Sequence, residues 1–257
     1  MPALWEWGLA AGAVAFGTGV SVAVTRAIRR MPSTEPDQAA VDRLIARTPP
    51  LPDWAKPIDP LARVRAVVFD WRSLVDVGDR RNPWREIASQ SGRPVDPRSF
   101  DGSLMQYAKA SAVSWEPGWL DDLEAELESV RVRDGAIKAV EDLSAAGYRI
   151  AVTGNVQSPY LQRLRALLDI HWDVEVYSAE NGLWRPGRPM LGLLCAELDL
   201  LPSEILIVYS GESSVDGVRA FGLQGLIVDP LHPTLPHRVA GLGEILPRLR
   251  AARAAAP

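Results

Sequence analysis

The feature that most constrains this chain is the alternation of short apolar runs with amphipathic segments after residue 63. The run Val64–Phe69 is rich in β-branched residues and ends at Asp70, as expected of a buried parallel strand. Further strands are expected at Tyr148–Thr153, Asp173–Tyr177, Ile205–Tyr209 and Gln224–Val228, and helices at Asp134–Ala146, Pro159–Leu168, Pro189–Leu198, Val215–Phe221 and Val239–Arg250. This order predicts an α/β fold with a doubly wound parallel sheet, helices on both faces and ligands at the carboxyl ends of the strands.

The segment 76–132 interrupts this alternation and holds no β-like run. It carries helical patterns at Trp84–Ser91, Arg98–Val113 and Trp119–Val130. We expect an inserted helical cap above the strand ends. Its tryptophans, Trp84, Trp115 and Trp119, are read as helix-packing core rather than as a binding surface.

The first 30 residues read as a membrane anchor. No charged residue occurs from Trp7 to Thr25, a length that spans roughly 30 Å as a helix. Interfacial aromatic residues stand at one end of this segment and a positive cluster at the other: Trp5 and Trp7, then Arg26, Arg29 and Arg30. By the positive-inside rule the arginines mark the cytoplasmic end. We therefore expect a single-pass membrane protein whose soluble domain faces the cytoplasm.

A cleaved signal peptide is the alternative interpretation of the apolar segment, but Glu6 replaces the usual positive charge and no small-residue cleavage site follows. Residues 31–62 are expected to form a short helix and a proline-rich linker. The remaining boundaries follow: a core of residues 63–75 and 133–250, a cap of residues 76–132 and a tail of residues 251–257.

Composition narrows the possible functions. A net charge of −4 and a pI near 5.5 provide no positive field for nucleic acid. The lone cysteine, Cys195, lies in an apolar run and reads as a small buried residue. His171, His232 and His237 lack metal-ligand spacing and are expected at the surface. No nucleotide-binding glycine loop or serine elbow is present.

Several segments together resemble the haloacid dehalogenase superfamily over Val64–Leu249. They are the strand Val67-Val68-Phe69-Asp70, the stretch from Gly135 to Thr153, the pair Arg185-Pro186 and the run from Gly217 to Gly222. The chain is most similar to the branch with a helical cap after the first motif, which includes phosphatases and 2-haloacid dehalogenases. The resemblance implies a Rossmann-like core.

The resemblance also implies roles for individual residues. Asp70 stands at the nucleophile, Thr153 at the residue that binds the transferred group, and Arg185 at the family's lysine. Arg72 replaces the aspartate that serves phosphatases as general acid, and Leu74 replaces a threonine. A guanidinium holds its proton too tightly to act as an acid, so that route of catalysis is lost.

The fourth motif departs furthest from the family. Tyr209 and Ser214 stand where metal-binding aspartates are expected, which leaves Asp70 as a poor Mg²⁺ site by itself. Mg²⁺ is expected only if Glu212 or Asp216 substitutes, and a solvated loop is the plainer interpretation of Glu212. The resemblance implies that the metal-independent dehalogenases use serine, asparagine and aspartate groups at the positions of Tyr209, Gly211 and Ser214, and none of these three residue types is retained at its position.

Asp70 also has a structural interpretation, since a carboxylate at a strand end can accept hydrogen bonds from the N–H groups of the next turn or form an ion pair with Arg72 or Arg185.

The leading hypothesis is a membrane-tethered protein that has lost catalysis and acts as an interaction or structural subunit of a membrane complex. The alternatives are a divergent phosphohydrolase and a metal-independent dehalogenase-like hydrolase, both with Asp70 as nucleophile.

Overall fold

The structure is a computed structural model that describes residues 59–78, 81–92, 97, 100–183, 187–211 and 215–256. The expected anchor, with Trp5, Trp7, Arg26, Arg29 and Arg30, lies outside these residues. So does most of the linker. Within the described ranges, no helix is long and apolar enough to cross a membrane. Residues Asp59–Ala256 form one compact unit.

A six-stranded sheet forms the centre of this unit, with the strand order β5-β4-β1-β6-β7-β8. All five neighbouring pairs are parallel. The strands are β1 (Ala66–Asp70), β4 (Arg149–Gly154), β5 (Val174–Tyr177), β6 (Ile205–Tyr209), β7 (Gln224–Val228) and β8 (Arg238–Val239). The sheet confirms the predicted α/β class. After β1 the chain adds β4 and β5 on one side of β1, and it then crosses to the other side of β1 to form β6. In open α/β sheets a ligand binds where the direction of strand addition reverses, so the crevice beyond the carboxyl ends of β1 and β6 is the expected ligand position.

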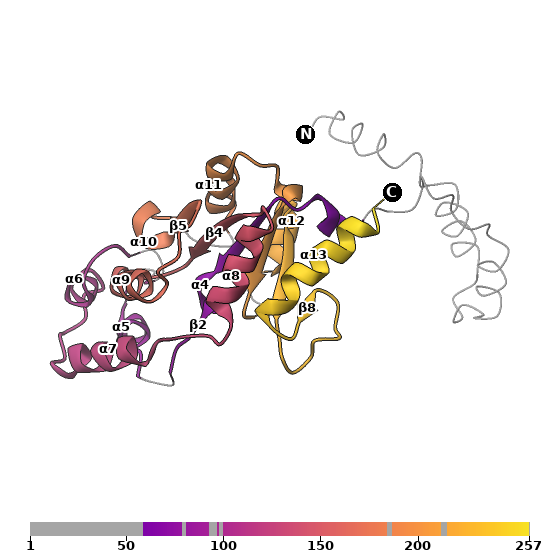
Figure 1. The fold of residues 1–257 in the computed structure, drawn as a ribbon. Coiled ribbons are helices and arrows are strands. Elements are labelled where there is room, and N and C mark those ends of the chain that lie inside the picture. The colour runs from indigo at the N-terminus through magenta and orange to yellow at the C-terminus, as the bar shows by residue number, and fades with distance from the viewer. Residues whose placement is uncertain are drawn as a thin grey trace, which may run out of the picture. The chain divides into compact units, whose positions relative to one another are not determined.

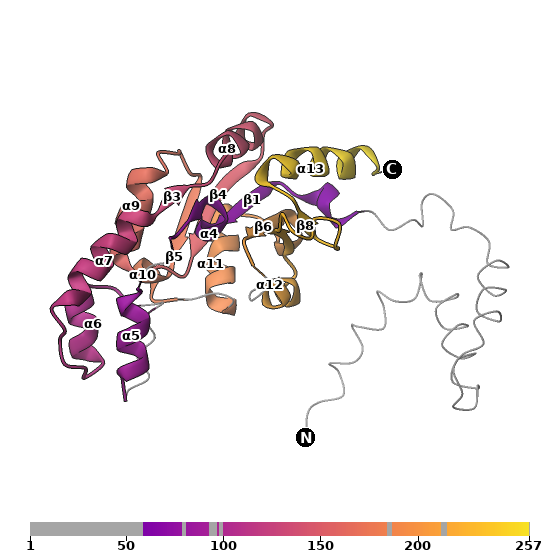
Figure 2. The ribbon, with the colours of Figure 1, turned by 90° about the horizontal axis from the view of Figure 1, so that it is seen from below.

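Helices cover both faces of the sheet (Figures 1 and 2). One face packs against α8 (Ala136–Ala145), α9 (Ser158–Leu167) and α13 (Ile245–Ala254), and the other against α11 (Arg188–Leu198) and α12 (Val215–Phe221). Successive side chains of a strand point to opposite faces of the sheet. In β1, Val67 and Phe69 pack in the core under α8, α9 and α13, and Ala66 and Val68 pack in the core under α11 and α12. Short helices complete the unit: α4 (Trp71–Leu74), α10 (Ser178–Asn181), and 3₁₀ turns at Pro60–Arg63, Pro202–Glu204 and Leu242–Glu244.

The cap consists of α5 (Pro83–Gln90), α6 (Leu104–Ala110) and α7 (Gly118–Ser129), at one end of the unit (Figure 1). Its two ends meet in a short antiparallel pair, β2 (Val75–Asp76) and β3 (Arg131–Val132). The expectation that 76–132 holds no strand was therefore wrong at both edges. Two residues are too few to show an alternating pattern, and the pairing itself creates these strands.

Aromatic side chains fill the cap, as the packing interpretation predicts. Trp84 and Trp119 are fully buried, and Trp115 packs against the core while partly exposed. The ring centroids of Trp84 and Tyr107 lie 5.0 Å apart, and those of Trp115 and Trp119 lie 5.5 Å apart in an edge-to-face arrangement. These side chains serve to hold the cap helices together.

Two predicted helices begin at the wrong residue. The helix expected from Arg98 begins at Leu104, because Ser103 and Gln106 form a capping box there. The closing helix expected from Val239 begins at Ile245 and runs to Ala254. Residues Arg238 and Val239 pair instead with the end of β7, as a sixth strand that the sequence pattern did not reveal.

Candidate functional site

Asp70 ends β1 and lies beside Thr153 of β4 in the sheet register. One of its carboxylate oxygens accepts a hydrogen bond from the backbone N–H of Arg72 at 2.8 Å, which makes Asp70 the N-cap of α4. The hydroxyl of Ser73 donates to the Asp70 carbonyl at 2.7 Å. This is the backbone bond that the structural interpretation of Asp70 predicts.

Thr153 is fully buried at the end of β4. Its hydroxyl donates to the carbonyl of Val176 on the neighbouring strand β5, at 2.8 Å. The single proton of this hydroxyl is therefore already used inside the sheet. The structure brings Thr153 and Asp70 together, as expected, but the Thr153 hydroxyl does not donate toward the strand-end crevice.

Trp71 covers the end of β4. Its side chain is only 3% exposed, and its indole N–H donates to the carbonyl of Asn155 at 3.2 Å. A Cβ atom placed on Gly154 would lie 2.1 Å from Cδ1 of this ring. The indole therefore lies directly against the backbone that follows Thr153. Trp71 is not among the site residues predicted from the sequence, although a bulky aromatic residue beside Asp70 and a glycine after Thr153 are signals visible there.

The remaining residues of the predicted site are either buried in the core or lie outside the residues that the structure describes. Tyr209 is 2% exposed and packs in the core shared with α11 and α12, and Leu74 is fully buried in the opposite core. Arg185, Glu212 and Ser214 lie outside the described residues, as does the side chain of Asp216. The exposed histidines, His171, His232 and His237, are at the surface as predicted. Cys195 is only partly buried.

A pocket of about 400 Å³ opens between the cap and the ends of β1 and β6. Its lining is polar and comes from both parts of the unit: Arg72, Val75, Asp76, Val77, Gly78, Asn82, Arg85, Glu126, Arg133 and Ser210. Asp70 and Thr153 are not among these residues. The open space thus lies next to the expected catalytic pair rather than over it.

A buried hydrogen-bond network forms one wall of this pocket and ties the cap to the core. The Asn82 amide donates to one oxygen of Glu126 at 2.8 Å, and the Tyr160 hydroxyl donates to the other at 2.6 Å. Asn82 precedes α5, Glu126 belongs to α7, and Tyr160 belongs to core helix α9, which lies beside α7. Burial and, after it, the bond to Glu126 raise the pKa of Tyr160 well above its ordinary value.

A second tie lies at the base of the cap. The guanidinium of Arg133 pairs with Asp76 of β2 at 2.7 Å and donates to the carbonyl of Arg72 at 3.3 Å. Its backbone N–H also donates to the carbonyl of Leu74 at 2.9 Å. Arg133 therefore fastens the segment that enters the cap to the segment that leaves it.

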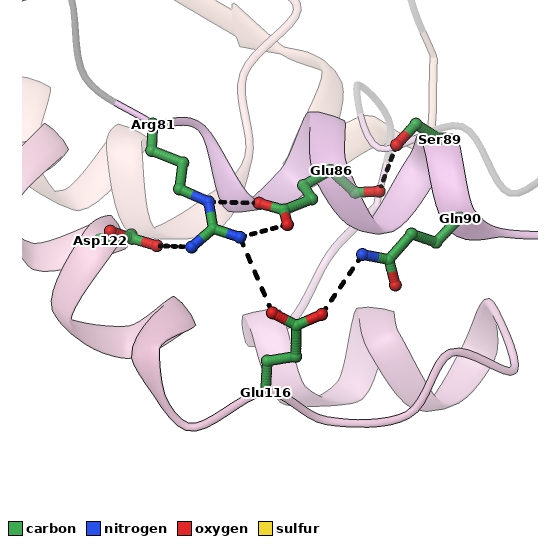
Figure 3. A network of polar contacts seen from close by, with 6 residues as sticks. All are labelled: Arg81, Glu86, Ser89, Gln90, Glu116 and Asp122. Carbon is green, nitrogen blue, oxygen red and sulfur yellow. Dashed lines mark hydrogen bonds and ion pairs between the residues drawn. The ribbon is translucent and has the colours of Figure 1, made fainter.

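Arg81 organises the outer surface of the cap (Figure 3). It binds Glu86 through two nitrogens, Asp122 at 3.1 Å and Glu116 at 3.7 Å. These carboxylates come from α5, from α7 and from the segment before α7. The Glu86 hydrogen bond raises the pKa of Arg81. This network joins cap helices to each other, whereas the Glu126 network joins the cap to the core.

Solved structures that this fold resembles include dehalogenases and phosphatases. A dehalogenase is 20% identical with a TM-score of 0.54, covering 72% of this chain and 96% of its own. A haloacid dehalogenase phosphatase from Thermococcus onnurineus is 18% identical with a TM-score of 0.53, covering 72% and 98%. A Bacteroides thetaiotaomicron enzyme of that family, complexed with magnesium and phosphate, is 9% identical with a TM-score of 0.52, covering 64% and 93%.

The chain has the haloacid dehalogenase fold. No protein-family model matches the sequence, and no curated protein matches it. The likeness therefore rests on the arrangement of the elements, including the cap inserted after β1. It agrees with the resemblance found in the motifs.

The haloacid dehalogenase phosphatases imply a Mg²⁺ ion at the strand ends, and the described residues of this chain do not fit one. Mg²⁺ requires several oxygen ligands in near-octahedral array. Asp70 already caps α4, Arg72 brings a positive charge, and Tyr209 is buried in the core. No group of three potential metal-ligating side chains occurs among the residues that the structure describes.

Proposed function

We propose that this chain is a haloacid dehalogenase-fold protein that has lost hydrolase activity and serves as an interaction or structural subunit. We further propose that residues 1–30 hold it at the cytoplasmic face of a membrane, beside other membrane proteins. The unbroken apolar segment from Trp7 to Thr25 and the arginines after it support the tether.

The observation that carries the loss of catalysis is the position of Trp71. Its ring packs against Gly154, the residue after Thr153, where a Cβ atom would lie 2.1 Å away. A transferred group would need the Thr153 hydroxyl, which instead bonds Val176. Together with Arg72 in place of a general acid, these contacts leave Asp70 without the assistance that a carboxylate nucleophile requires.

A divergent phosphohydrolase is the second candidate, and kinship of fold with the Thermococcus phosphatase supports it. It would use Asp70 as nucleophile, and Mg²⁺ held partly by Glu212 or Asp216. A metal-independent dehalogenase is the third candidate, supported by the fold likeness to a dehalogenase.

Hydrolysis assays separate these candidates. The full chain, purified in mild detergent, is assayed on a generic phosphate ester with and without Mg²⁺, and on a 2-haloacid, beside the Asp70→Asn variant. Asparagine caps a helix as well as aspartate, so the variant keeps its fold and removes the nucleophile. We expect equal background rates. A rate that Asp70→Asn abolishes contradicts the loss of catalysis, and its Mg²⁺ dependence then distinguishes the two hydrolases.

The proposed role as a subunit has its own test. The full chain carrying an affinity tag is extracted from its native membranes in mild detergent and sized on a native gel. A defined complex larger than the chain and its micelle is expected. Migration of the chain alone contradicts the subunit role without bearing on catalysis.

A further inference from the structure

Helix α13 carries three arginines and no acidic residue. Arg248, Arg250 and Arg253 are the only charged residues in this helix. Arg250 and Arg253 are exposed, whereas Arg248 is partly buried and donates to the carbonyl of Arg238 at 2.7 Å. Within the part of the chain that the structure describes, none of the three forms an ion pair. The exposed side of α13 is therefore positively charged.

Small side chains surround these arginines on the exposed face of α13. Pro247, Ala251 and Ala254 follow one another at spacings of four and three residues, which places them on one face of the helix, and all are exposed. Small side chains allow the helix to approach a flat surface closely, and they offer little apolar area for insertion into a bilayer. A partner of this face is therefore held by charge rather than by apolar contact.

The C-terminal end of α13 lies beside the segment through which the chain enters the folded unit. The guanidinium of Arg253 donates to the carbonyl of Val64 at 2.8 Å. Val64 follows the 3₁₀ turn that contains Arg63, and this turn packs against α13. Arg63 is exposed and forms no ion pair with another described residue. We call the surface formed by Arg63, Arg250 and Arg253 the basic end.

Three exposed acids on neighbouring elements offset part of this charge. Asp59 and Glu244 accept hydrogen bonds from nearby backbone N–H groups, and Glu141 belongs to α8, which packs beside α13. Charges more than about 8 Å apart are largely screened at physiological salt, so the arginines nearest a partner count most. Glu244 lies roughly 14 Å along the helix axis from Arg253. The basic end therefore keeps a local excess of positive charge, although a small one.

The cap, at the opposite end of the unit from the C-terminal end of α13, carries the opposite charge (Figures 1 and 2). Residues 76–132 contain eleven acidic and seven basic residues, a net charge of −4 that equals the net charge of the whole chain. On α7, Asp121, Glu124 and Glu128 are exposed and form no ion pair with a described residue. An anionic surface would attract the basic end and repel the cap.

We propose that the basic end lies against the anionic phospholipid headgroups of the membrane that holds the chain, so that the cap points away from the bilayer. This orientation rests on the proposed membrane tether. Residues 31–58 could extend up to roughly 90 Å, so the linker by itself selects no face of the unit. A tether provides an effective concentration in the millimolar range, which is sufficient for a weakly charged surface. Each arginine near the anionic cytoplasmic leaflet strengthens binding about fivefold.

Fluorescence quenching in vesicles tests this orientation. The full chain is reconstituted into vesicles of phosphatidylcholine alone, or of equal parts phosphatidylcholine and phosphatidylglycerol, each with nitroxide-labelled headgroups. A dye is attached at Ala254→Cys on α13 or at Glu124→Cys on the cap, both exposed positions, in a Cys195→Ala background. We expect strong quenching at residue 254 in the anionic vesicles only, and weak quenching at residue 124 in both. Salt at about 1 M, where the screening length is about 3 Å, should remove the difference.

Two double variants connect the quenching to the arginines. Arg63→Gln/Arg250→Gln should lower the surface-bound population on the order of tenfold or more. Arg253 stays in place because its contacts also hold α13 to the core. Arg85→Gln/Lys109→Gln removes the same number of charges from exposed positions on α5 and α6 and should leave the quenching unchanged. All four substituted positions are exposed, so unchanged thermal melting verifies that each variant is folded.

Each outcome bears on one proposal. Equal quenching in the two kinds of vesicle, equal quenching at the two labelled positions, or undiminished quenching in the Arg63→Gln/Arg250→Gln variant overturns the lipid-facing surface. Binding of these arginines to nucleic acid without quenching in anionic vesicles overturns it too.

The tether is measured separately, by flotation of the unaltered chain with phosphatidylcholine vesicles at high salt. A chain that does not float contradicts the tether. Flotation with the anionic vesicles then decides the lipid-facing surface: dependence on Arg63 and Arg250 supports it, and lack of that dependence overturns it.

Discussion

At the scale of single residues, the contact between Trp71 and Gly154 fills the space at the carboxyl end of β4. A glycine here is required by contact, since any Cβ would enter the Trp71 ring at 2.1 Å. The sequence allowed Asp70, Thr153 and Tyr209 to be placed at neighbouring strand ends, because each ends a short apolar run. It did not indicate that the Trp71 side chain packs onto β4, since side-chain direction at the start of the four-residue helix α4 depends on tertiary packing.

We predict that Gly154→Ala lowers the free energy of unfolding by about 1–3 kcal/mol, because overpacking forces the indole from its position. Urea unfolding measures the loss. Adding Trp71→Leu should recover part of it by freeing the space. Gly192→Ala is the control: its Cβ would have no atom within 4 Å and it lies inside α11, so it should be stabilising. Equal effects of the two alanines would show that the Trp71 contact is absent.

At the scale of elements, a buried network joins the cap to the core and an exposed network joins the cap helices to each other. Glu126 of α7 is buried and bonded to Asn82 and Tyr160, while Arg81 is about half exposed. Buried polar groups cost most when they lose their partners, whereas exposed ion pairs are screened by water and salt. The buried network around Glu126 should therefore contribute more to stability than the exposed network around Arg81.

Glu126→Ala should lower the free energy of unfolding by about 2–4 kcal/mol, because it leaves the Tyr160 hydroxyl and the Asn82 amide without their acceptor. Glu126→Gln keeps an acceptor and should cost about 1 kcal/mol or less. Urea unfolding at pH 7 compares them. Glu124→Ala, exposed on the same helix, should change stability by less than about 0.5 kcal/mol. An alanine effect no larger at Glu126 than at Glu124 would contradict the network.

Alkaline pH should loosen the same attachment. Burial, then the bond to Glu126, raise the pKa of Tyr160, so the unfolded chain loses this proton at lower pH than the folded chain. The stabilisation is complete below the unfolded pKa of about 10 and declines above it, by up to about 1.4 kcal/mol per pH unit. Tyr160→Phe should remove that part of the decline. Urea unfolding from pH 9 to 11 measures both slopes, and identical slopes would contradict the assignment.

Elements that show a long periodic pattern were predictable, and those made by pairing or capping were not. β6, α12 and β7 have the expected boundaries because each coincides with a whole apolar or amphipathic run. The strands β2, β3 and β8 contain two residues each, and they form because their backbone pairs with residues distant in the sequence. The start of α6 depends on the Ser103 cap, which competes with an apparently longer helical pattern.

At the scale of the whole molecule, the tether proposed for residues 1–30 would decide where the folded unit works. We predict that the full chain stays in the membrane fraction after alkaline carbonate extraction, because an apolar helix inserts stably. A variant lacking residues 2–30 should move to the soluble fraction with its thermal melting unchanged. Release of the full chain by carbonate would contradict the anchor. As a control, Gly192→Ala in the full chain should leave fractionation unchanged.

The position of β1 also has a consequence for synthesis of the protein. Among the described strands, β1 is the first to leave the ribosome, yet it lies inside the sheet between β4 and β6. Both neighbours are translated only after the whole cap, so the apolar segment Ala66–Phe69 waits without a strand to pair with. Unpaired apolar strands promote aggregation during folding. Translation speed through the cap and access to chaperones should therefore govern the yield of folded protein more than they would for a fold whose first strand lies at an edge.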